Sequence, residues 1–289
     1  MRSRKKFHYK SLCVFLGITL LSSSLMATDT YDPITNQLSI PSVKVGTSTY
    51  NNVVITVGNI VSVGGASSTQ SAEGLWSGTT STGYELNSLV LENNEFWTIV
   101  GKTIGDVFYV FGFSNGAASV NANSYSSFFR EYTATTSVLG YGTGTVTTNT
   151  KISGTVTTTS GNTTQNTTIS MTPPSASLYD YNKNANINEV VGNWTGSFLS
   201  GYSGTVQVLS NGQVTGITNG CNFSGSFSPR SSGKNAFDFS LVNGSGCFIP
   251  GYKSSGIAIS YITSSGKRQL IAASTNDTKT QGDLFFAQR

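Results

Sequence analysis

The sequence predicts an all-β protein made of antiparallel strands, and three observations indicate this. Charged residues make up only 10% of the chain, while serine, threonine, asparagine and glycine occur throughout it. Apolar residues alternate with these polar ones, which is the period-two pattern of half-buried strands. Short runs of this kind are separated by turn residues such as Asn93-Asn94 and Asn211-Gly212, which adopt the backbone angles of tight turns readily. We therefore expect hairpins and meanders.

Residues 1–27 are predicted to be a cleavable signal peptide. Basic residues precede an apolar run over 12–21, and a small residue, Ala27, stands at its exit. The run is shorter than the roughly 20 residues of a membrane-spanning helix, and no later segment approaches that length, so we expect no transmembrane helix. Cys13 lies inside the run, which argues against a lipid-modified N-terminal cysteine. The mature protein is expected to be exported, and to be secreted, periplasmic or at the cell surface.

Loss of the signal changes the charge and the available chemistry. It removes five of the 17 basic residues and none of the 13 acidic ones, which leaves a net charge of about −1. No basic stripe remains, so nucleic acid is not an expected partner. The only histidine, His8, is removed as well. This excludes Ser-His-Asp and Cys-His catalysis and histidine-ligated metals, and we expect no cofactor and no metal site.

Two cysteines remain, Cys221 and Cys247, separated by 26 positions. In an oxidising compartment such a pair is expected to form a disulfide, with two buried free thiols as the alternative. A loop of this size would stabilise the fold by about 3 kcal/mol on the chain-entropy model.

The elements fall into three parts. Residues 28–65 form an N-terminal hairpin segment, in which 38–57 reads as two strands around a turn at Gly46. A first β module spans 74–181 and contains an apolar run, 107–113, expected to be a strand buried on both faces. Two hairpins are also predicted in this module, with strands at 84–92 and 95–101, and at 143–159 and 163–171.

The C-terminal module, 192–289, shows the most regular pattern. Short strands with Gly and Asn turns between them predict a closed, eight-stranded up-and-down barrel, with a sandwich of two sheets as the alternative. A single helical turn over 187–191 leads into it. The expected strands lie near 193–199, 203–209, 213–218, 221–228, 235–242, 255–262, 268–274 and 281–287.

The two modules begin alike, with Gly74-Leu-Trp76-Ser-Gly78 and Gly192-Asn-Trp194-Thr-Gly196, which indicates an internal duplication. A Gly-x-Trp in the first strand resembles the lipocalin and calycin barrels. In that arrangement the tryptophan plugs the closed end beneath a basic residue that follows the last strand. The resemblance implies that Trp194 and Arg289 close the C-terminal barrel, through a cation-π contact of about 1 kcal/mol.

A broader resemblance covers most of the mature chain. Residues 31–41, 74–83 and the barrel around 221–247 resemble uncharacterised exported β-proteins of Gram-negative bacteria. The architecture is also similar to the surface barrels of transferrin-binding-type lipoproteins. The lipid-bearing cysteine of that family is missing, and none of its partner-binding residues can be matched here. The resemblance therefore implies a fold and no particular ligand.

These observations favour a non-catalytic binding protein that captures a protein, glycan or small ligand through its loops or an exposed sheet face. The expected contact surface is Phe128, Phe129 and Arg130. Adjacent residues in a strand point to opposite faces, so one of the two phenylalanines should be exposed beside Arg130.

Two alternatives remain open. One is a structural or integral outer-membrane β-barrel component of the cell envelope, although most predicted strands are shorter than the roughly 9 to 11 residues that a bilayer requires. The other is a carbohydrate hydrolase, which would need a pair of carboxylates across the scissile bond. Most acidic residues lie beside Asn or Gly at turns, where solvation and turn hydrogen bonds account for them.

Overall fold

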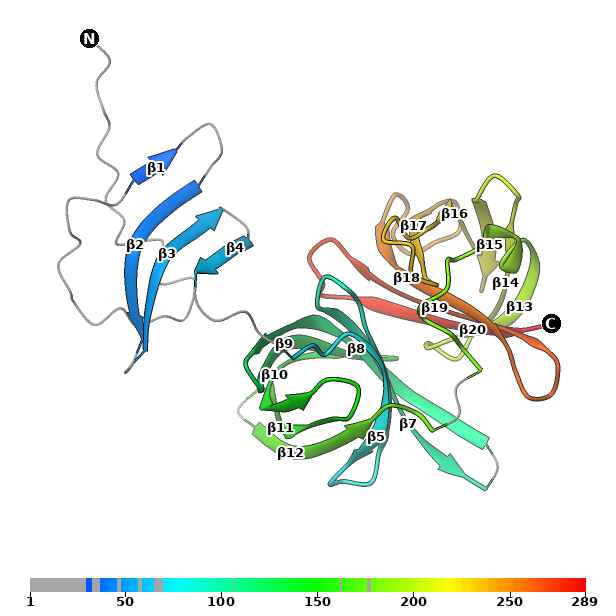
Figure 1. Ribbon diagram of the computed structural model, residues 1–289. Coiled ribbons are helices and arrows are strands. Elements are labelled where there is room, and N and C mark those ends of the chain that lie inside the picture. The colour runs from blue at the N-terminus through cyan, green and yellow to red at the C-terminus, as the bar shows by residue number, and fades with distance from the viewer. Residues whose placement is uncertain are drawn as a thin grey trace, which may run out of the picture. The chain divides into compact units, whose positions relative to one another are not determined.

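The computed structural model describes residues 70–105, 107–161, 163–175 and 178–289 with their side chains, and the backbone of four strands before them (Figure 1). Residues 1–29, with the expected signal peptide, lie outside the described residues. The chain divides into two compact units, Met1–Ser67 and Ser68–Arg289. The predicted all-β, antiparallel fold is confirmed, because every sheet pairs its strands in antiparallel fashion.

The first unit contains one four-stranded sheet in the order β1-β2-β3-β4. Its central strands, β2 and β3, pair from Val45 and Ser48 at the turn to Gln37 and Thr56. The expected hairpin is thus the centre of a larger sheet. The strands are β1 Thr30–Asp32, β2 Gln37–Val45, β3 Ser48–Thr56 and β4 Asn59–Gly64.

The second unit begins with a closed barrel of eight strands, which we call the first barrel. Each strand pairs with the next along the chain, and β12 pairs with β5 to close the ring, with Met171 opposite Gly78. A Cβ at Gly78 would overlap the Ser170 carbonyl, so glycine permits this close approach. The strands are β5 Gly74–Thr80, β6 Glu85–Val90, β7 Glu95–Ile104, β8 Val107–Asn121, β9 Ser124–Thr133, β10 Ser137–Thr147, β11 Lys151–Ser160 and β12 Thr163–Thr172.

The second barrel follows after a short 3-10 helix, η3 (Ile187–Glu189). It has the predicted eight strands in up-and-down order, and β13 pairs with β20 to close it, with Gly196 opposite Ala287. The sandwich alternative is therefore wrong. The strands are β13 Gly192–Phe198, β14 Ser203–Val208, β15 Gln213–Thr218, β16 Cys221–Pro229, β17 Phe237–Asn243, β18 Lys253–Ile262, β19 Arg268–Asn276 and β20 Gly282–Gln288.

The outer faces of the two barrels pack against each other through an apolar cluster. The first barrel contributes a stack of three rings, Trp97, Phe113 and Tyr132, with centroids 6.1 and 4.8 Å apart. The second barrel contributes apolar side chains that include Ile257 and Leu284. Because this cluster is as buried as either barrel interior, the barrels form one packed body.

Polar contacts surround this cluster. Arg230 of the second barrel is 2.7 Å from the Glu92 carboxylate of the first barrel and 2.6 Å from Asp238. Burial acts to raise the pKa of Glu92, but hydrogen bonds from Arg230 and Tyr181 outweigh it and hold this pKa below its ordinary value. The Tyr132 hydroxyl donates to the Lys279 carbonyl at 2.7 Å. These bonds fix the register of one barrel on the other.

The expectation that 107–113 is buried on both faces is wrong. Val107, Tyr109 and Phe111 are 53%, 48% and 46% exposed. The β7–β8 pairing has a bulge next to Val100 and Gly101, which shifts the register by one residue. Alternate side chains of the hairpin beyond this bulge are therefore exposed, although the sequence there is apolar.

Candidate ligand-binding site

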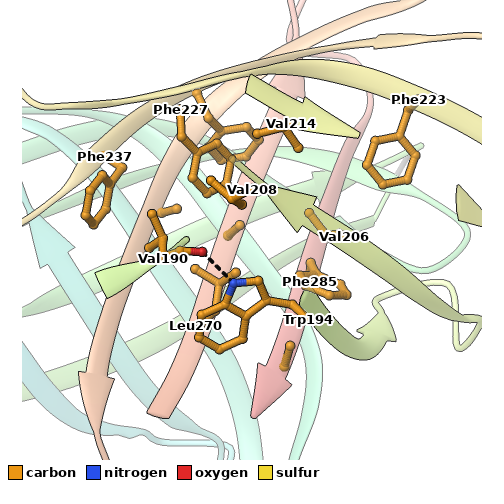
Figure 2. Close-up of a cluster of buried hydrophobic side chains, with 14 residues drawn as sticks. Val190, Trp194, Val206, Val208, Val214, Phe223, Phe227, Phe237, Leu270 and Phe285 are labelled. Carbon is orange, nitrogen blue, oxygen red and sulfur yellow. Dashed lines mark hydrogen bonds between the residues drawn. The ribbon is translucent and has the colours of Figure 1, made fainter. Parts of the chain in front are cut away.

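Both barrels are closed at one end by a tryptophan in the same way. The indole Nε1 of Trp76 donates to the Ala72 carbonyl at 2.7 Å, and that of Trp194 donates to the Val190 carbonyl at 2.7 Å (Figure 2 shows the second). The two side chains are 2% and 0% exposed. In each case the acceptor lies four residues earlier, so the chain that enters the barrel also seals it.

The cover over the two tryptophans differs. The Arg289 guanidinium lies 4.0 Å from the centroid of the Trp194 ring, which is the geometry of a cation-π contact. Burial, and the nearby charge of Arg268, lower the pKa of Arg289. In the second barrel, Arg289 stands two positions after Ala287, which pairs with Gly196 where the ring closes. The corresponding residue of the first barrel is Pro173, two positions after Met171, and it carries no charge.

The interior of the second barrel is filled mainly with aromatic rings (Figure 2). Phe198 packs against Phe223 and Phe285, with centroids 6.1 and 4.8 Å apart. A cavity of about 320 Å³ remains above them, toward the open end of the barrel. The other inward rings of this core are Trp194, Phe227, Phe237 and Phe239.

The interior of the first barrel contains a larger cavity of about 450 Å³, which we call the first lumen. The inward face of strand β10 carries few side chains. Val138 lines the cavity and Val146 belongs to the barrel core, so the positions between them with the same parity, Gly140, Gly142 and Gly144, also face inward. Three inward positions of one strand therefore carry no side chain.

The lining of the first lumen is apolar at the closed end and mixed above it. Phe96 and Phe129 pack edge to face, with centroids 6.1 Å apart, over Trp76 and its neighbours. Higher up, the Thr98 hydroxyl donates to the Ser88 hydroxyl at 2.7 Å. A volume of this size, apolar walls and few polar groups are typical of small-molecule sites, which measure about 300 to 1,000 Å³.

One charged residue, Glu131, lies among the residues that line the first lumen. Its neighbours across the sheet are Ser114 on β8 and Val138 on β10, neither of which carries a charge. Burial raises the pKa of Glu131. A carboxyl group in this position suits a ligand with a positive charge or a hydrogen-bond donor.

Two aromatic residues mark the open end of the first lumen. Tyr84 and Phe111 both line the cavity and meet edge to face, with centroids 5.7 Å apart. They are 41% and 46% exposed. The open end is thus an aromatic rim that water reaches in this structure, and such exposed rings are common at binding sites.

The open end of the second barrel is built differently. The carboxylate of Asp283 accepts hydrogen bonds from the backbone N–H groups of Leu284 at 2.8 Å and Leu199 at 3.2 Å. Burial outweighs these bonds and raises the pKa of Asp283 to about 6. Two residues of the first barrel, Thr133 and Ala134, also line this cavity.

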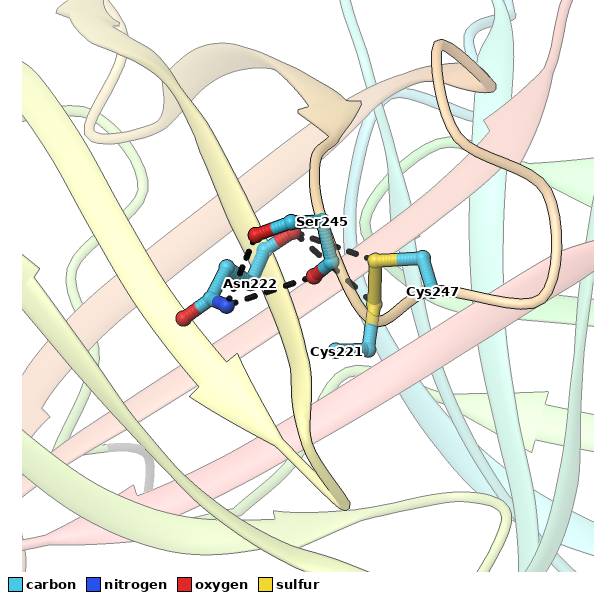
Figure 3. Close-up of a disulfide and its surroundings, with 4 residues drawn as sticks. All are labelled: Cys221, Asn222, Ser245 and Cys247. Carbon is cyan, nitrogen blue, oxygen red and sulfur yellow. Dashed lines mark hydrogen bonds between the residues drawn. A yellow bond between two sulfur atoms is a disulfide. The ribbon is translucent and has the colours of Figure 1, made fainter.

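The predicted disulfide joins Cys221, the first residue of β16, to Cys247 in the loop after β17 (Figure 3). The neighbouring Asn222 side chain donates to the carbonyl and the hydroxyl of Ser245, each at 3.2 Å. The disulfide therefore holds a loop at the open end of the second barrel, since Cys221 also lines the cavity there.

The structure separates the three residues of the expected contact surface. Phe128 is 62% exposed on the outer face of β9, whereas Phe129 is 6% exposed and belongs to the core of the first barrel. Arg130 is half-buried on the outer face and donates to the Ser137 hydroxyl at 3.2 Å. Phe129 therefore cannot contact a partner at the surface. Tyr141, which is 52% exposed and pairs with Phe128 across the strands, takes its place beside Phe128.

Among the residues described with side chains, no cluster of three or more His, Cys, Asp or Glu side chains forms a metal site. No helix within the described part of the chain is long and apolar enough to cross a membrane. The fold and the site thus define a protein of two fused barrels, each with an open cavity, of which the cavity in the first barrel is the larger.

No family model matches this chain, and no curated protein matches it. Similar solved structures include a protein of unknown function from the DUF3598 family of Nostoc punctiforme PCC 73102. That match has 12% identity and a TM-score of 0.24, and covers 75% of this chain and 93% of the other. Another is a mutant of the vaccine antigen transferrin binding protein B from Haemophilus parasuis Hp5, with 11% identity and a TM-score of 0.24.

A double mutant of the same transferrin binding protein matches with 9% identity and a TM-score of 0.25. Each of these two matches covers 90% of this chain and 65% of the other, so this chain spans less than two thirds of those proteins. The similarity carries no inference about ligand or partner.

Sequence analysis did not identify the first lumen or Glu131. A usable signal was present, because Gly140, Gly142 and Gly144 occupy every second position of a strand and are flanked by inward valines. That signal has meaning only once the strand and its inward face are known, since period-two glycines also occur on outer faces.

Proposed function

We propose that this chain is an exported, non-catalytic binding protein that holds a small, largely apolar ligand in the first lumen. The observation that carries the proposal is the cavity of about 450 Å³, which lies above the core that contains Trp76 and is rimmed by Tyr84 and Phe111 at its open end. Export is supported by the signal-like N-terminus and by the Cys221–Cys247 disulfide, which persists in oxidising compartments.

The inward and outward residues of the first barrel favour this function over an integral membrane barrel. Barrels that span a bilayer present apolar side chains outward and polar ones inward. Here two inward side chains of β12, Ile169 and Met171, belong to the apolar core, and the inward Gln165 and Thr167 line the lumen nearer its open end. The outward ones are exposed and polar: Thr164, Asn166, Thr168 and Ser170.

The carboxylates favour binding over glycoside hydrolysis. Hydrolysis of a glycosidic bond ordinarily uses two carboxyl groups, roughly 5 to 10 Å apart, facing one site. The residues that line the cavity of the first barrel include one carboxyl group, Glu131. Those that line the cavity of the second barrel also include one, Asp283.

A titration with the neutral fluorescent probe N-phenyl-1-naphthylamine tests the proposal. We expect saturable binding with one site per chain. Gly142→Leu should abolish it, because the atom nearest to a Cβ at Gly142 is the movable Ser127 hydroxyl, at 2.6 Å, and the added side chain would extend from the inward face of β10. Ala272→Leu, which fills the second cavity instead, is the matched control, and circular dichroism checks that both variants fold. Absence of binding, or binding that Gly142→Leu leaves intact, would overturn the proposal.

An outer surface offers a second candidate. Phe128 and Tyr141 form an exposed cross-strand aromatic pair on β9 and β10, with Leu139 and Arg130 beside them. Aromatic faces of this kind suit stacking with sugars or packing against a protein. If this surface captures a partner, the double substitution of Phe128 and Tyr141 by Ser should abolish binding to that protein or glycan. Binding of the fluorescent probe in the lumen should stay intact.

A further inference from the structure

The carboxyl group of Glu131 indicates which end group the ligand carries. It belongs to the inward row of β9 that includes Tyr125, Ser127 and Phe129, and it is the member of that row next to Thr133, at the open end. A ligand with its apolar body against Phe96 and Phe129 would therefore place its other end near this carboxyl group. We infer that the first lumen selects amphipathic amines, with the ammonium group toward Glu131.

The charge balance of the lumen supports an ammonium group. No lysine or arginine lies among the residues that line this cavity. Arg130, the neighbour of Glu131 in sequence, points to the outer face and bonds Ser137 there. Within the described part of the chain, no cationic side chain lines the cavity beside the Glu131 carboxylate, and a partly desolvated charge gains most from a partner that brings the opposite charge.

The rim adds a second feature that suits a cation. Tyr84 and Phe111 line the same cavity as Glu131 and expose 41% and 46% of their surface. Aromatic faces attract ammonium groups, with a benefit that grows as water is excluded. A fatty acid or other anionic amphiphile would meet the opposite conditions, since its carboxylate would approach Glu131.

The hydroxyl groups around the carboxyl group fit the same ligand. Ser114 lies directly across the sheet from Glu131, and Thr133 is two residues away on the same face of β9; both line the cavity. An ammonium group has several N–H donors, so it can bond a carboxylate and neighbouring hydroxyl oxygens together. A ligand without hydrogen-bond donors would leave the carboxylate and the hydroxyl oxygens to accept hydrogen bonds from water alone.

This inference rests on the proposed function, and one competition experiment distinguishes the two. Decylamine, decanol and decanoate share a ten-carbon chain and differ in the end group, and each is used at pH 8 to displace N-phenyl-1-naphthylamine. We expect decylamine to bind at least about tenfold more tightly than decanol, which corresponds to 1.4 kcal/mol, and decanoate to bind more weakly than decanol. The substitution Glu131→Gln should bring the amine and alcohol affinities together.

Asp283→Asn is the matched control, because it removes one negative charge from the other cavity. It should leave the preference for the amine unchanged, which separates the lumen carboxylate from the net charge of the protein. Equal binding of decylamine and decanol to the wild-type protein, or a preference that survives Glu131→Gln, would overturn the inference while the lumen site stands. If neither the probe nor any decyl compound binds, the proposed function fails and the inference fails with it.

Discussion

The two barrels begin with the same closure and differ in what fills them. In both, a glycine with positive φ precedes a buried tryptophan whose indole bonds a carbonyl four residues earlier. The second barrel then fills its interior with phenylalanine rings, whereas β10 of the first barrel turns three glycines inward. The corresponding cavities measure about 320 and 450 Å³. The same closure thus stands at the end of two cavities of different size and lining.

The difference continues at the two ends. The closed end of the second barrel carries Arg289 over Trp194, and its open end is held by a disulfide. The closed end of the first barrel has Pro173 in place of the arginine. Exposed aromatic rings lie at both open ends, Tyr84 and Phe111 at the first barrel and Tyr202 and Phe248 at the second. The cation-π contact and the disulfide are therefore both in the barrel with the smaller cavity.

The largest expected effect tests the shared closure. Trp76→Ala and Trp194→Ala should each lower the free energy of unfolding by about 3 to 5 kcal/mol, because each removes a fully buried indole and its hydrogen bond. Urea unfolding, followed by the fluorescence of the remaining tryptophans, measures both. A loss below about 1 kcal/mol in either variant would show that this barrel is not closed by its tryptophan.

The next effect concerns the second barrel alone. Reduction of Cys221–Cys247, or the double substitution to Ser, should lower the free energy of unfolding by about 3 kcal/mol. The disulfide then no longer restricts the unfolded chain between two residues 26 positions apart. Binding of the neutral probe in the first lumen should persist below the unfolding transition. Loss of probe binding in the folded, reduced protein would contradict the separate roles of the barrels.

A pH effect of intermediate size is expected from Asp283. Its pKa rises from 3.8 to about 6 on folding, so the folded state binds the proton more tightly. The stability that this proton brings is present below about pH 4 and is lost as pH rises through 6. Asp283→Asn should therefore stabilise the protein at pH 8 by about 2 kcal/mol, allowing for the partial exposure of the group, and by little at pH 4. Thermal unfolding at the two pH values measures this, and a gain that is equal at both would contradict the assignment.

The smallest expected effect tests the difference between the two closed ends. Arg289→Met keeps an apolar side chain over Trp194 but removes the cation, and should lower the free energy of unfolding by about 1 kcal/mol. Glycine substitution provides a matched pair, because a Cβ at Gly192 would overlap the Arg289 guanidinium whereas one at Gly74 meets nothing within 4 Å. Gly192→Ala should thus be the more destabilising of the two alanine variants. Equal losses would show that Arg289 does not cover the second closure.

The second barrel could be predicted from sequence because most of its turns carry a clear signal. Gly201, Gly212, Gly220 and Gly266 all have positive φ, and the strands between them are short and regular. The positions of Trp194 and Arg289 relative to each other followed from a resemblance to other barrels, and the structure places the two side chains in contact.

The first barrel was harder to predict because its turns and strands are less distinct. The stretch 143–159 was expected to be one strand, but it contains a turn at 148–150, where Asn149 has a φ of 53°. Strand β9 was not predicted as an element of a barrel, so the inward positions of Phe129 and Glu131 could not be assigned. Threonine and serine on both faces also weaken the alternation that reveals an inward side.

The most direct test of the account is to locate a ligand in the crystal. Crystals soaked with 1-bromodecane would reveal the bromine through its anomalous scattering, which distinguishes the two cavities without any assumption about affinity. The account predicts bromine in the first lumen, between Trp76 and the Tyr84–Phe111 rim, and none in the second cavity. Bromine in the second cavity alone, or in neither, would contradict the claim that the first barrel is the binding barrel.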